Sequence, residues 1–283
     1  MARTKDPSAA TRKAWLTRKR SGDDWRARLM GPVSKIEPLG GGVSQTRKVT
    51  LEDGTVGCFK WGGGLPEAEV AAWEVAKQVG MEDMVPPAVI REMDMAPPHG
   101  RQRGSFAEWM DGTTAERISE PGAQWGNDEH DVMRAAMFDF VIGNCDRHEG
   151  NWVVDDGKIR LIDHNLALSN YPFSEFFREI ARTRMADTSL ATYVKPYLDK
   201  LPHILAAVSG AMAQQRVPAY EKVVSDMEAR IHRAASAATW GALLEELGFS
   251  EKKSSSTGSG GWGSPSWSGS AAGASGPPPN ARS

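Results

Sequence analysis

The chain has 283 residues, of which 40% are hydrophobic and 25% are charged, so it holds enough apolar material for a sizeable folded core. Two cysteines, Cys58 and Cys145, exclude a disulfide scaffold and a four-thiolate zinc site, and no apolar run approaches the roughly 18 residues that a membrane helix needs. The net charge of −2 hides an asymmetry, because residues 1–30 carry nine Lys or Arg against three Asp, or +6, which leaves −8 for the remainder.

The two ends of the chain differ in composition from its middle. We expect residues 1–30 to form a basic, partly disordered arm, either simply solvated or used to dock a partner or nucleic acid. Residues 254–283 contain seven Gly, ten Ser and four Pro but no Ile, Leu, Val, Met or Phe, which predicts a disordered tail over residues 251–283. Trp262 and Trp267 are candidate motif anchors in a tail that is otherwise passive.

The first part of the middle region predicts mostly strands. Asp53-Gly54 lies between two apolar runs and is typical of a hairpin turn. A helix is predicted to begin at Pro66, because Pro suits the first helical turn and the acidic Glu67 and Glu69 follow it there. The predicted strands are residues 33–39, 46–51, 56–61, 85–90 and 105–110.

The second part of the middle region is predicted to be helical from His130 onward, apart from a hairpin around residues 155–157. A small sheet with one helix, followed by a helical half, predicts two lobes, residues 31–110 and 111–250, with a crevice between them. The helical stretch 174–249 is expected to shape the lower lobe, with a core that includes Leu190, Tyr193 and Tyr197.

A glycine-rich segment, residues 39–46 (LGGGVSQT), separates the first two predicted strands, and Lys60 lies near the end of the third. Glycines let backbone N–H groups approach phosphate oxygens, and a strand-borne Lys binds phosphate by charge. Taken alone, the same pattern is also typical of a plain turn and a solvated Lys. The next helix offers Glu69 as a partner for Lys60, with Glu67 and Glu74 as rivals; Glu69 is preferred because it directly precedes an apolar helix face.

A second motif, residues 139–165, combines a polar loop with a short apolar hairpin. A hairpin brings Asn151 and Asp163, at its two open ends, close together. Carboxylate and amide oxygens are hard ligands that suit Mg²⁺ with nucleotide phosphates. Asp146 lies a loop's reach away, where it can accept a hydroxyl proton or orient the attacking group.

The pattern Asp146-Arg147-His148-x-x-Asn151, followed by Asp163-His164-Asn165, resembles the catalytic and metal-binding loops of the phosphatidylinositol 3-/4-kinase-related atypical kinases. The longer stretch that contains both motifs, residues 138–168, is similar to small bacterial and phage members of that family. The resemblance spans about residues 38–168 and has the glycine loop, Lys60, Glu69 and both Asp motifs in the family's order. It implies an α+β, bilobal, protein-kinase-like fold, with a small antiparallel-sheet N-lobe that carries one helix and a mostly helical C-lobe.

The resemblance also implies roles for individual residues. Lys60 would contact the ATP phosphates, and Glu69 would orient Lys60. Asp146 would be the catalytic Asp, while His148 would stabilise the transferring phosphate or share the proton-accepting role, a division that the resemblance leaves open. The implied metal ligands, for Mg²⁺ or alternatively Mn²⁺, are Asn151 and Asp163.

Two further segments would bind the nucleotide if the resemblance holds. The glycine loop would cradle the phosphates through Gly40, Gly41, Gly42, Val43 and Ser44. The stretch 105–111 occupies the position of the interlobe hinge, where backbone groups would read the adenine edge at Glu108, Trp109 and Met110. Three other polar residues are expected to brace the catalytic loop: Asp139, Asn144 and, as an alternative to touching ligand, Arg147.

The sequence departs from the family pattern at two positions. Asn165 stands where a Gly is usual, and Asn is the non-Gly residue that best tolerates a positive φ. Cys145 stands where relatives often have a hydroxyl. Neither change removes a ligand, so the sequence predicts an active enzyme and not a pseudokinase.

The function predicted is ATP- and Mg²⁺-dependent transfer of the γ-phosphate to a hydroxyl acceptor on an unidentified protein or small molecule. A lipid substrate is disfavoured, since the basic residues 178, 182 and 184 are balanced by the acidic residues 175, 179 and 187 and no cysteine cluster suits acylation. The alternatives are a phosphatidylinositol kinase, a nucleotide-binding pseudokinase scaffold, a metallophosphoesterase and a merely structural polar loop. We expect a reduced, cytoplasmic protein without stable membrane insertion, whose basic arm offers a docking site.

Overall fold

The computed structural model describes residues 24–39, 45–117, 129–155, 157–169, 174, 178, 180, 182 and 185–249. The chain divides into two units, Met1–Ser250 and Glu251–Ser283, and every described residue belongs to the first. The predicted tail and most of the predicted basic arm lie outside the described residues, as does the glycine loop from Gly40 to Ser44.

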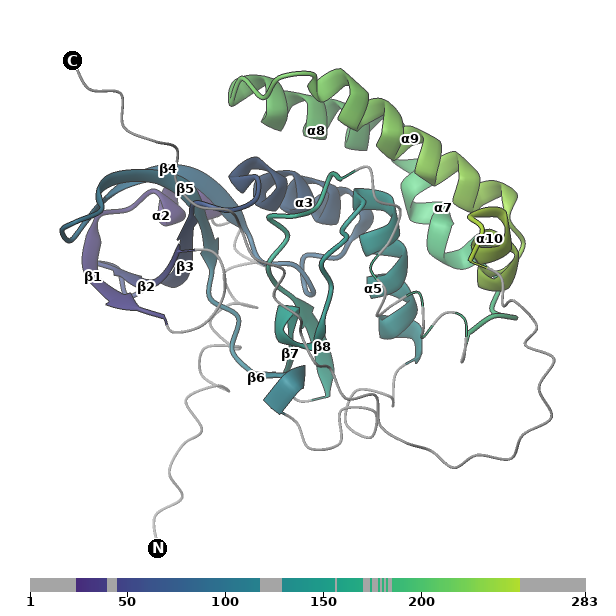
Figure 1. Ribbon diagram of the computed structural model, residues 1–283, viewed down its shortest axis with the longest axis horizontal. Helices are drawn as coiled ribbons and strands as arrows, with labels where there is room; N and C mark the ends of the chain where they lie inside the picture. Colours follow the sequence, from purple (N-terminus) through teal and green to yellow (C-terminus); the bar gives the residue numbers. More distant parts are fainter. Residues whose placement is uncertain are drawn as a thin grey trace, which may run out of the picture. The chain divides into compact units, whose positions relative to one another are not determined.

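An antiparallel sheet of five strands, in the order β1-β2-β3-β5-β4, occupies the first part of the chain and curls strongly (Figure 1). Its inner face holds a compact apolar core that includes Val49, Phe59 and Phe106, each with no exposed surface. Along β3, Phe59 and Trp61 alternate with half-buried Lys60, so Lys60 lies on the opposite face of the sheet. The strands are β1 (Val33–Pro38), β2 (Gln45–Leu51), β3 (Val56–Trp61), β4 (Ala88–Met95) and β5 (Gly100–Glu108).

The hairpin of β4 and β5 is longer than the sequence pattern predicted, since the two strands stay in register as far as Met95 and Gly100. The sequence of its outer half is typical of a charged loop, because four of the positions there are Glu92, Asp94, Arg101 and Arg103. Met93 and Met95 nevertheless alternate with these charged residues and are buried in the sheet core. Strand β4 also begins at Ala88, three residues later than expected, because Val85 packs into the other core of the protein.

Helix α3 (Pro66–Val79) covers the sheet and carries Glu69 in its first turn. Pro66 begins the helix, and Gly80 ends it with a φ of 73°, which a glycine adopts without strain. A short helix, α2 (Trp25–Leu29), packs beside it and is capped by the Asp24 side chain. The end of the predicted arm therefore forms part of the fold, with Leu29 buried in the sheet core.

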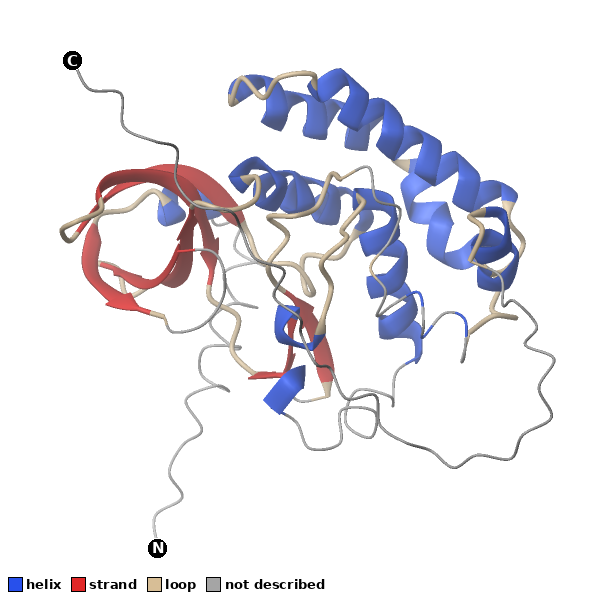
Figure 2. Ribbon diagram, in the orientation of Figure 1, coloured by secondary structure: helices blue, strands red, loops and turns tan. Residues whose placement is uncertain are grey.

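The second part of the chain is mostly helical, as predicted (Figure 2). Helix α8 lies along α3, and α9 runs beside α8 (Figure 1). Arg103 of β5 donates to both Glu67 of α3 and Gln215 at the end of α8, at 2.6 Å each. Leu190 and Tyr197 are buried in the core, as expected. The helices are α5 (Glu129–Ile142), α7 (Ala191–Asp199), α8 (Leu201–Gln214), α9 (Tyr220–Ser236) and α10 (Trp240–Glu246).

A second, three-stranded antiparallel sheet in the order β6-β7-β8 lies between these parts. Two backbone hydrogen bonds join it and its following loop to the first part of the chain: Leu161 N–H donates to the Met84 carbonyl at 2.7 Å, and Leu65 N–H donates to the Asn165 carbonyl at 2.7 Å. The elements are β6 (Thr113–Thr114), β7 (Trp152–Asp155) and β8 (Lys158–Leu161), with 3-10 turns at Ala115–Arg117 and Glu149–Asn151.

The α+β class predicted from the sequence is confirmed, with a small antiparallel sheet followed by a mostly helical region. The predicted hairpin around residues 155–157 is the β7–β8 connection. None of the helices in the described part of the chain is both long and apolar enough to span a bilayer.

Candidate active site

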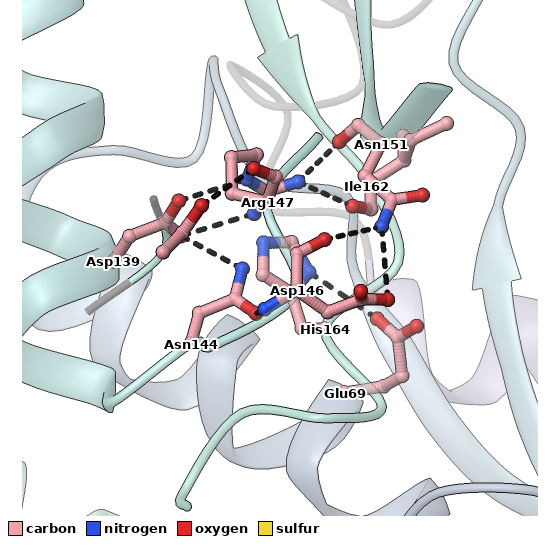
Figure 3. A network of polar contacts seen from close by, with 9 residues as sticks. Glu69, Asp139, Asn144, Asp146, Arg147, Asn151, Ile162 and His164 are labelled. Atoms are coloured by element: carbon pink, nitrogen blue, oxygen red, sulfur yellow. Dashed lines mark hydrogen bonds and ion pairs between the residues drawn. The ribbon is translucent and has the colours of Figure 1, made fainter. Parts of the chain in front are cut away.

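The loop between α5 and β7 is held by a fully buried ion pair, Asp139 with Arg147, whose side chains have no exposed surface. The contact is bidentate: Arg147 Nε donates to one carboxylate oxygen at 2.8 Å and Nη2 donates to the other at 3.0 Å. Asn144 Nδ2 donates to the same carboxylate at 3.0 Å (Figure 3). Asp139 and Asn144 therefore brace this loop, as the sequence predicted.

The remaining nitrogen of Arg147 reaches the base of the hairpin. Its Nη1 donates to the carbonyls of Asn151, which precedes β7, and Ile162, which follows β8, the latter at 2.6 Å. Ile162 N–H also donates to the Asn151 carbonyl at 3.0 Å. Arg147 thus acts as a structural brace, and it fixes the two open ends of the hairpin beside each other (Figure 3).

Asp146 and Asn151, two predicted site residues, lie in contact. Asn151 Nδ2 donates to the Asp146 carbonyl at 2.7 Å and approaches its carboxylate Oδ2 at 3.4 Å. Asn144 Oδ1 accepts from Asp146 N–H at 3.2 Å, which connects Asp146 to the buried Arg147 cluster. The Asp146 side chain is half-buried, so its carboxylate stays within reach of a ligand.

His148 is exposed, and its ring is oriented by its own turn. Its Nδ1 accepts from Gly150 N–H at 3.0 Å. A ring nitrogen that accepts must carry a lone pair, so in the neutral ring the proton is on Nε2. His148 therefore presents an N–H donor on its outer edge.

Lys60 is the cation at the centre of a second polar cluster, which we name the Lys60 cluster: Lys60, Glu69, Asp163 and His164. Lys60 Nζ lies 2.8 Å from Asp163 Oδ1 and 3.4 Å from Glu69 Oε1. The rival acids pair elsewhere, Glu67 with Arg103 and Glu74 with Lys77. Of the three acids considered for Lys60, Glu69 alone makes the contact in the described part of the chain.

The charges of the Lys60 cluster shift one another's pKa. Burial alone would lower the pKa of Lys60, but the Glu69 and Asp163 carboxylates outweigh it and raise the pKa above its ordinary value. Burial alone would raise the pKa of Glu69, but Lys60 and the hydrogen bond from His164 outweigh it and lower the pKa. Both groups are therefore charged across the physiological pH range.

Asp163 follows β8 in a left-handed backbone conformation, with a φ of 61°. Asp is one of the few non-Gly residues that adopt this region with modest strain. The sequence pattern had drawn attention to Asn165 for this reason, yet Asn165 is not among the positive-φ residues of the described chain. The sharp turn falls instead on the carboxylate residue itself, whose side chain is 28% exposed.

The donor set fits a hard divalent cation that also binds phosphate. Asn151 precedes and Asp163 follows the Trp152–Leu161 pair that closes the hairpin base, and both offer oxygen ligands. In the described part of the chain, no group of three or more His, Cys, Asp or Glu gathers as a metal site. Mg²⁺ is commonly held by one or two protein ligands with phosphate oxygens and water completing its shell, so this sparse set suits it.

The predicted hinge residues lie at the end of β5. Two of their N–H groups are committed within the protein, Glu108 to the Pro87 carbonyl and Trp109 to the Val56 carbonyl, at 2.9 Å each. The Glu108 carboxylate accepts two hydrogen bonds from Arg28 of α2, at 2.8 and 3.1 Å. Adenine contacts in this stretch would therefore fall to the other backbone groups, which include those of Met110.

The two cysteines lie near the predicted site, and the surroundings of Cys58 disfavour its thiolate. Cys58 is on the same face of β3 as Lys60, and burial raises its pKa to about 11. Cys145, beside Asp146, approaches the Leu166 carbonyl with its Sγ at 3.5 Å.

Two residues that contact the site were assigned no role from the sequence. His164 lies in the motif given above, and its place directly after an apolar strand could have indicated a site residue. Its partner Glu69 could not be predicted, because the two residues are 95 positions apart in the sequence. Arg28 was counted only as part of a basic arm, and no local pattern connects it to Glu108, 80 positions away.

Residues 130–194 match the family model described as "Phosphatidylinositol 3- and 4-kinase". The matched segment contains Asp146, His148, Asn151 and Asp163. This match confirms the predicted resemblance to the phosphatidylinositol 3-/4-kinase family for the segment with the two Asp motifs, and it supports the prediction of a kinase. No curated protein matches the chain.

Among solved structures, the chain resembles a Golgi casein kinase with Mn/ADP bound, at 14% identity and a TM-score of 0.46 over 77% of this chain and 74% of that one. A second structure of the Golgi casein kinase gives 14% identity and a TM-score of 0.48 over 77% and 75%. The hydra Fam20 structure with sugar gives 14% identity and a TM-score of 0.36 over 71% and 87%. Each likeness is weak, so the interpretation of the site depends on its own geometry and on the family match.

Proposed function

We propose that this protein is a phosphotransferase that uses Mg²⁺ and moves the γ-phosphate of ATP to a hydroxyl group on a protein or small molecule. The observation that carries the proposal is the convergence of Lys60, Glu69 and Asp163 in one cluster. These three side chains come from a strand, a helix and a loop that are distant in sequence. Phosphoryl transfer depends on such charge placement more than on covalent chemistry.

The charge of the Lys60 cluster favours a bound cation. One ammonium faces two carboxylates, so Lys60, Glu69 and Asp163 together carry −1. Asp146 adds a further carboxylate across the site. A divalent cation would offset this excess and would draw phosphate oxygens toward Lys60.

Asn151 and Asp163 are the residues that would hold Mg²⁺. When bound, the ion supplies neutralisation and orientation of the phosphate oxygens. Lys60 would hold the phosphates by charge, and Glu69 would keep Lys60 extended from β3. The residues Gly40, Gly41, Gly42, Val43 and Ser44 are proposed to cover the phosphates, and backbone groups around Met110 to bind the adenine.

The hydrogen bonds favour a division of roles between Asp146 and His148 that the sequence left open. His148 uses its Nδ1 lone pair for Gly150 N–H, so its neutral ring has no second lone pair with which to accept a proton. Asp146 keeps a half-buried carboxylate that is oriented by Asn151. We therefore assign proton acceptance from the hydroxyl to Asp146, and contact with the transferring phosphate to His148 through Nε2–H.

A phosphatidylinositol kinase is the second candidate, since the matching family is described by lipid kinases. The balanced charges of residues 164–187 argue against a headgroup-binding surface. A protein or small-molecule acceptor therefore stays the first choice. We also propose a reduced, cytoplasmic setting, which suits a chain whose two cysteines are both free.

The test is incubation of the purified full chain with Mg²⁺ and γ-labelled ATP, alongside Lys60→Met and Asp163→Asn. The acceptor arms are proteins, small-molecule alcohols and phosphatidylinositol vesicles, and label incorporation is expected in one arm and lost in both variants. The matched control is Lys195→Met, since Lys195 pairs with Asp199 on the surface. Equal background in the wild type and both variants overturns the proposal.

Two further measurements separate the alternatives. α-labelled ATP tests for nucleotidyl transfer, which would label the acceptor from α-labelled ATP but not from γ-labelled ATP, because the β- and γ-phosphates leave as pyrophosphate. Calorimetry with Mg-ATP identifies a pseudokinase, because such a protein binds nucleotide without turnover, whereas a merely structural loop binds none.

A further inference from the structure

His164 is fully buried between α3 and α5, directly after Asp163. Its Nδ1 lies 3.3 Å from Glu69 Oε2, and its ring meets the edge of the Phe138 ring at 5.9 Å between centroids. Its Nε2 is buried and makes no hydrogen bond within the described residues. The one polar contact of the ring there is therefore with Glu69 (Figure 3).

The direction of this hydrogen bond follows from the charge of Glu69. An ionised carboxylate has only acceptors, so Nδ1 must carry a proton and donate. The two oxygens of Glu69 are then divided, with Oε1 facing Lys60 and Oε2 accepting from His164. Each oxygen of this buried carboxylate has a partner, which fixes its rotation.

The division matters because Lys60 has two competing acids. It lies closer to Asp163 than to Glu69, at 2.8 against 3.4 Å. If Glu69 lost its second anchor, it would be free to turn away, and Lys60 would pair with Asp163 alone. Lys60 already contacts Asp163 Oδ1, and without Glu69 its whole charge would compete with Mg²⁺ for that carboxylate.

We infer that His164 is a positioning residue, which donates through Nδ1–H to Glu69, thereby keeps Glu69 on Lys60 and so limits the competition of Lys60 with the metal for Asp163. This inference rests on the proposed function of the site. It differs from a packing role, because it requires a donor at one ring position and not merely a group of the right size.

The experiment compares His164→Asn with His164→Gln. The Asn amide reaches the position of Nδ1, whereas the Gln amide reaches that of Nε2, so only the Asn variant retains the donor. We expect His164→Asn to bind Mg-ATP within about threefold of the wild type, and His164→Gln to bind about tenfold to hundredfold more weakly, as for loss of a hydrogen bond to a charged group. A third variant, His164→Leu, fills the cavity without a donor. It replaces the Gln variant if that protein does not fold, and the same loss of Mg-ATP binding is expected.

A double-mutant cycle with Glu69→Gln tests whether His164 acts through Glu69. If it does, His164→Leu weakens Mg-ATP binding and transfer much less in the Glu69→Gln background than in the wild type. Thermal unfolding is measured for every variant, because a packing role predicts that losses follow Tm alone.

The outcomes distinguish the inference from the proposed function. Equal losses of Mg-ATP binding in the Asn and Gln variants, or additive effects of the two mutations in the cycle, overturn the role of His164. If the wild type still binds Mg-ATP and transfers phosphate, the proposed function stands. A wild type that neither binds Mg-ATP nor transfers phosphate overturns the proposed function, and the role of His164 with it.

Discussion

Two ion-pair clusters are connected to the residues at the hairpin base, and they differ in how completely their charges are paired. In the first, Asp139 and Arg147 are completely buried and joined by two hydrogen bonds of 2.8 and 3.0 Å. In the second, Lys60 is shared between Glu69 and Asp163, and the Lys60 and Asp163 side chains are 13% and 28% exposed.

This difference distinguishes a structural cluster, Asp139 with Arg147, from a candidate binding site, the Lys60 cluster. Every nitrogen of Arg147 has an acceptor, and the Asp139 charge is matched one to one, so this cluster has no capacity left for a ligand. The Lys60 cluster has an excess negative charge and is open to solvent on the side of Asp163. A charge imbalance that solvent can reach is where an ion and phosphate would bind.

The largest expected effect on stability comes from breaking the buried Asp139–Arg147 ion pair. Asp139→Ala leaves a buried guanidinium without its anion, and we expect the free energy of unfolding to fall by about 3–5 kcal/mol. Urea denaturation measures this change. The control is Asp199→Ala, which removes a surface partner of Lys195 and is expected to change stability little; comparable losses in both variants would contradict the comparison.

Changing the second cluster should separate stability from activity. Asp163→Asn keeps the side-chain size and tolerates the φ of 61°, and Lys60 retains Glu69. We expect the free energy of unfolding to change by less than about 1 kcal/mol, while phosphate transfer falls by at least about a hundredfold. Parallel denaturation and transfer assays give both values, and retained transfer would remove Asp163 from the site.

Acid should destabilise the protein partly through Glu69. Its pKa is lowered on folding, so its contribution to stability is present above its ordinary pKa of 4.5 and is lost as the pH falls through the lowered value. We expect unfolding free energies measured from pH 5 downward to fall less steeply in Glu69→Gln than in the wild type. Parallel slopes in the two proteins would show that this carboxyl has the same pKa in the folded and unfolded states.

The smallest effect on activity is expected at the predicted hinge, where Arg28 pairs with Glu108 and both side chains are 10% exposed. This pair lies between the two clusters in burial. Arg28→Met keeps most of the packing, so we expect a loss of about 1–2 kcal/mol in stability and a modest rise in KM for ATP. The control is Arg101→Met, which breaks an exposed pair with Glu92. The same changes in stability and KM in both variants would show that Arg28 has no particular role at the predicted hinge.

Local patterns predicted the elements that local chemistry determines. The bounds of β3, the start of α3 at Pro66 and the β7–β8 hairpin follow from alternation, a Pro in the first helical turn and an Asp-Gly turn. The choice of Glu69 over its neighbours also agreed with the geometry, because the helix face already fixed its direction.

Features that depend on distant contacts were missed or incomplete. The outer half of β4–β5 looks like a loop because its charged residues face solvent, and only pairing with the neighbouring strand makes it a strand. His164 and Arg28 gain their roles from partners 95 and 80 positions away. Neither contact follows from propensity or periodicity.

Helix α8 has a practical consequence for anyone who designs a shorter version of this protein. The family match ends at residue 194, before α8 begins at Leu201, yet α8 lies along α3, the helix that carries Glu69. A fragment that keeps α3 but ends at residue 194 would uncover an apolar face of α3 and lose the Arg103 link to Gln215. A C-terminal expression boundary taken from the family match would thus produce an aggregation-prone piece, whereas a fragment that runs through residue 249 keeps the covering helices.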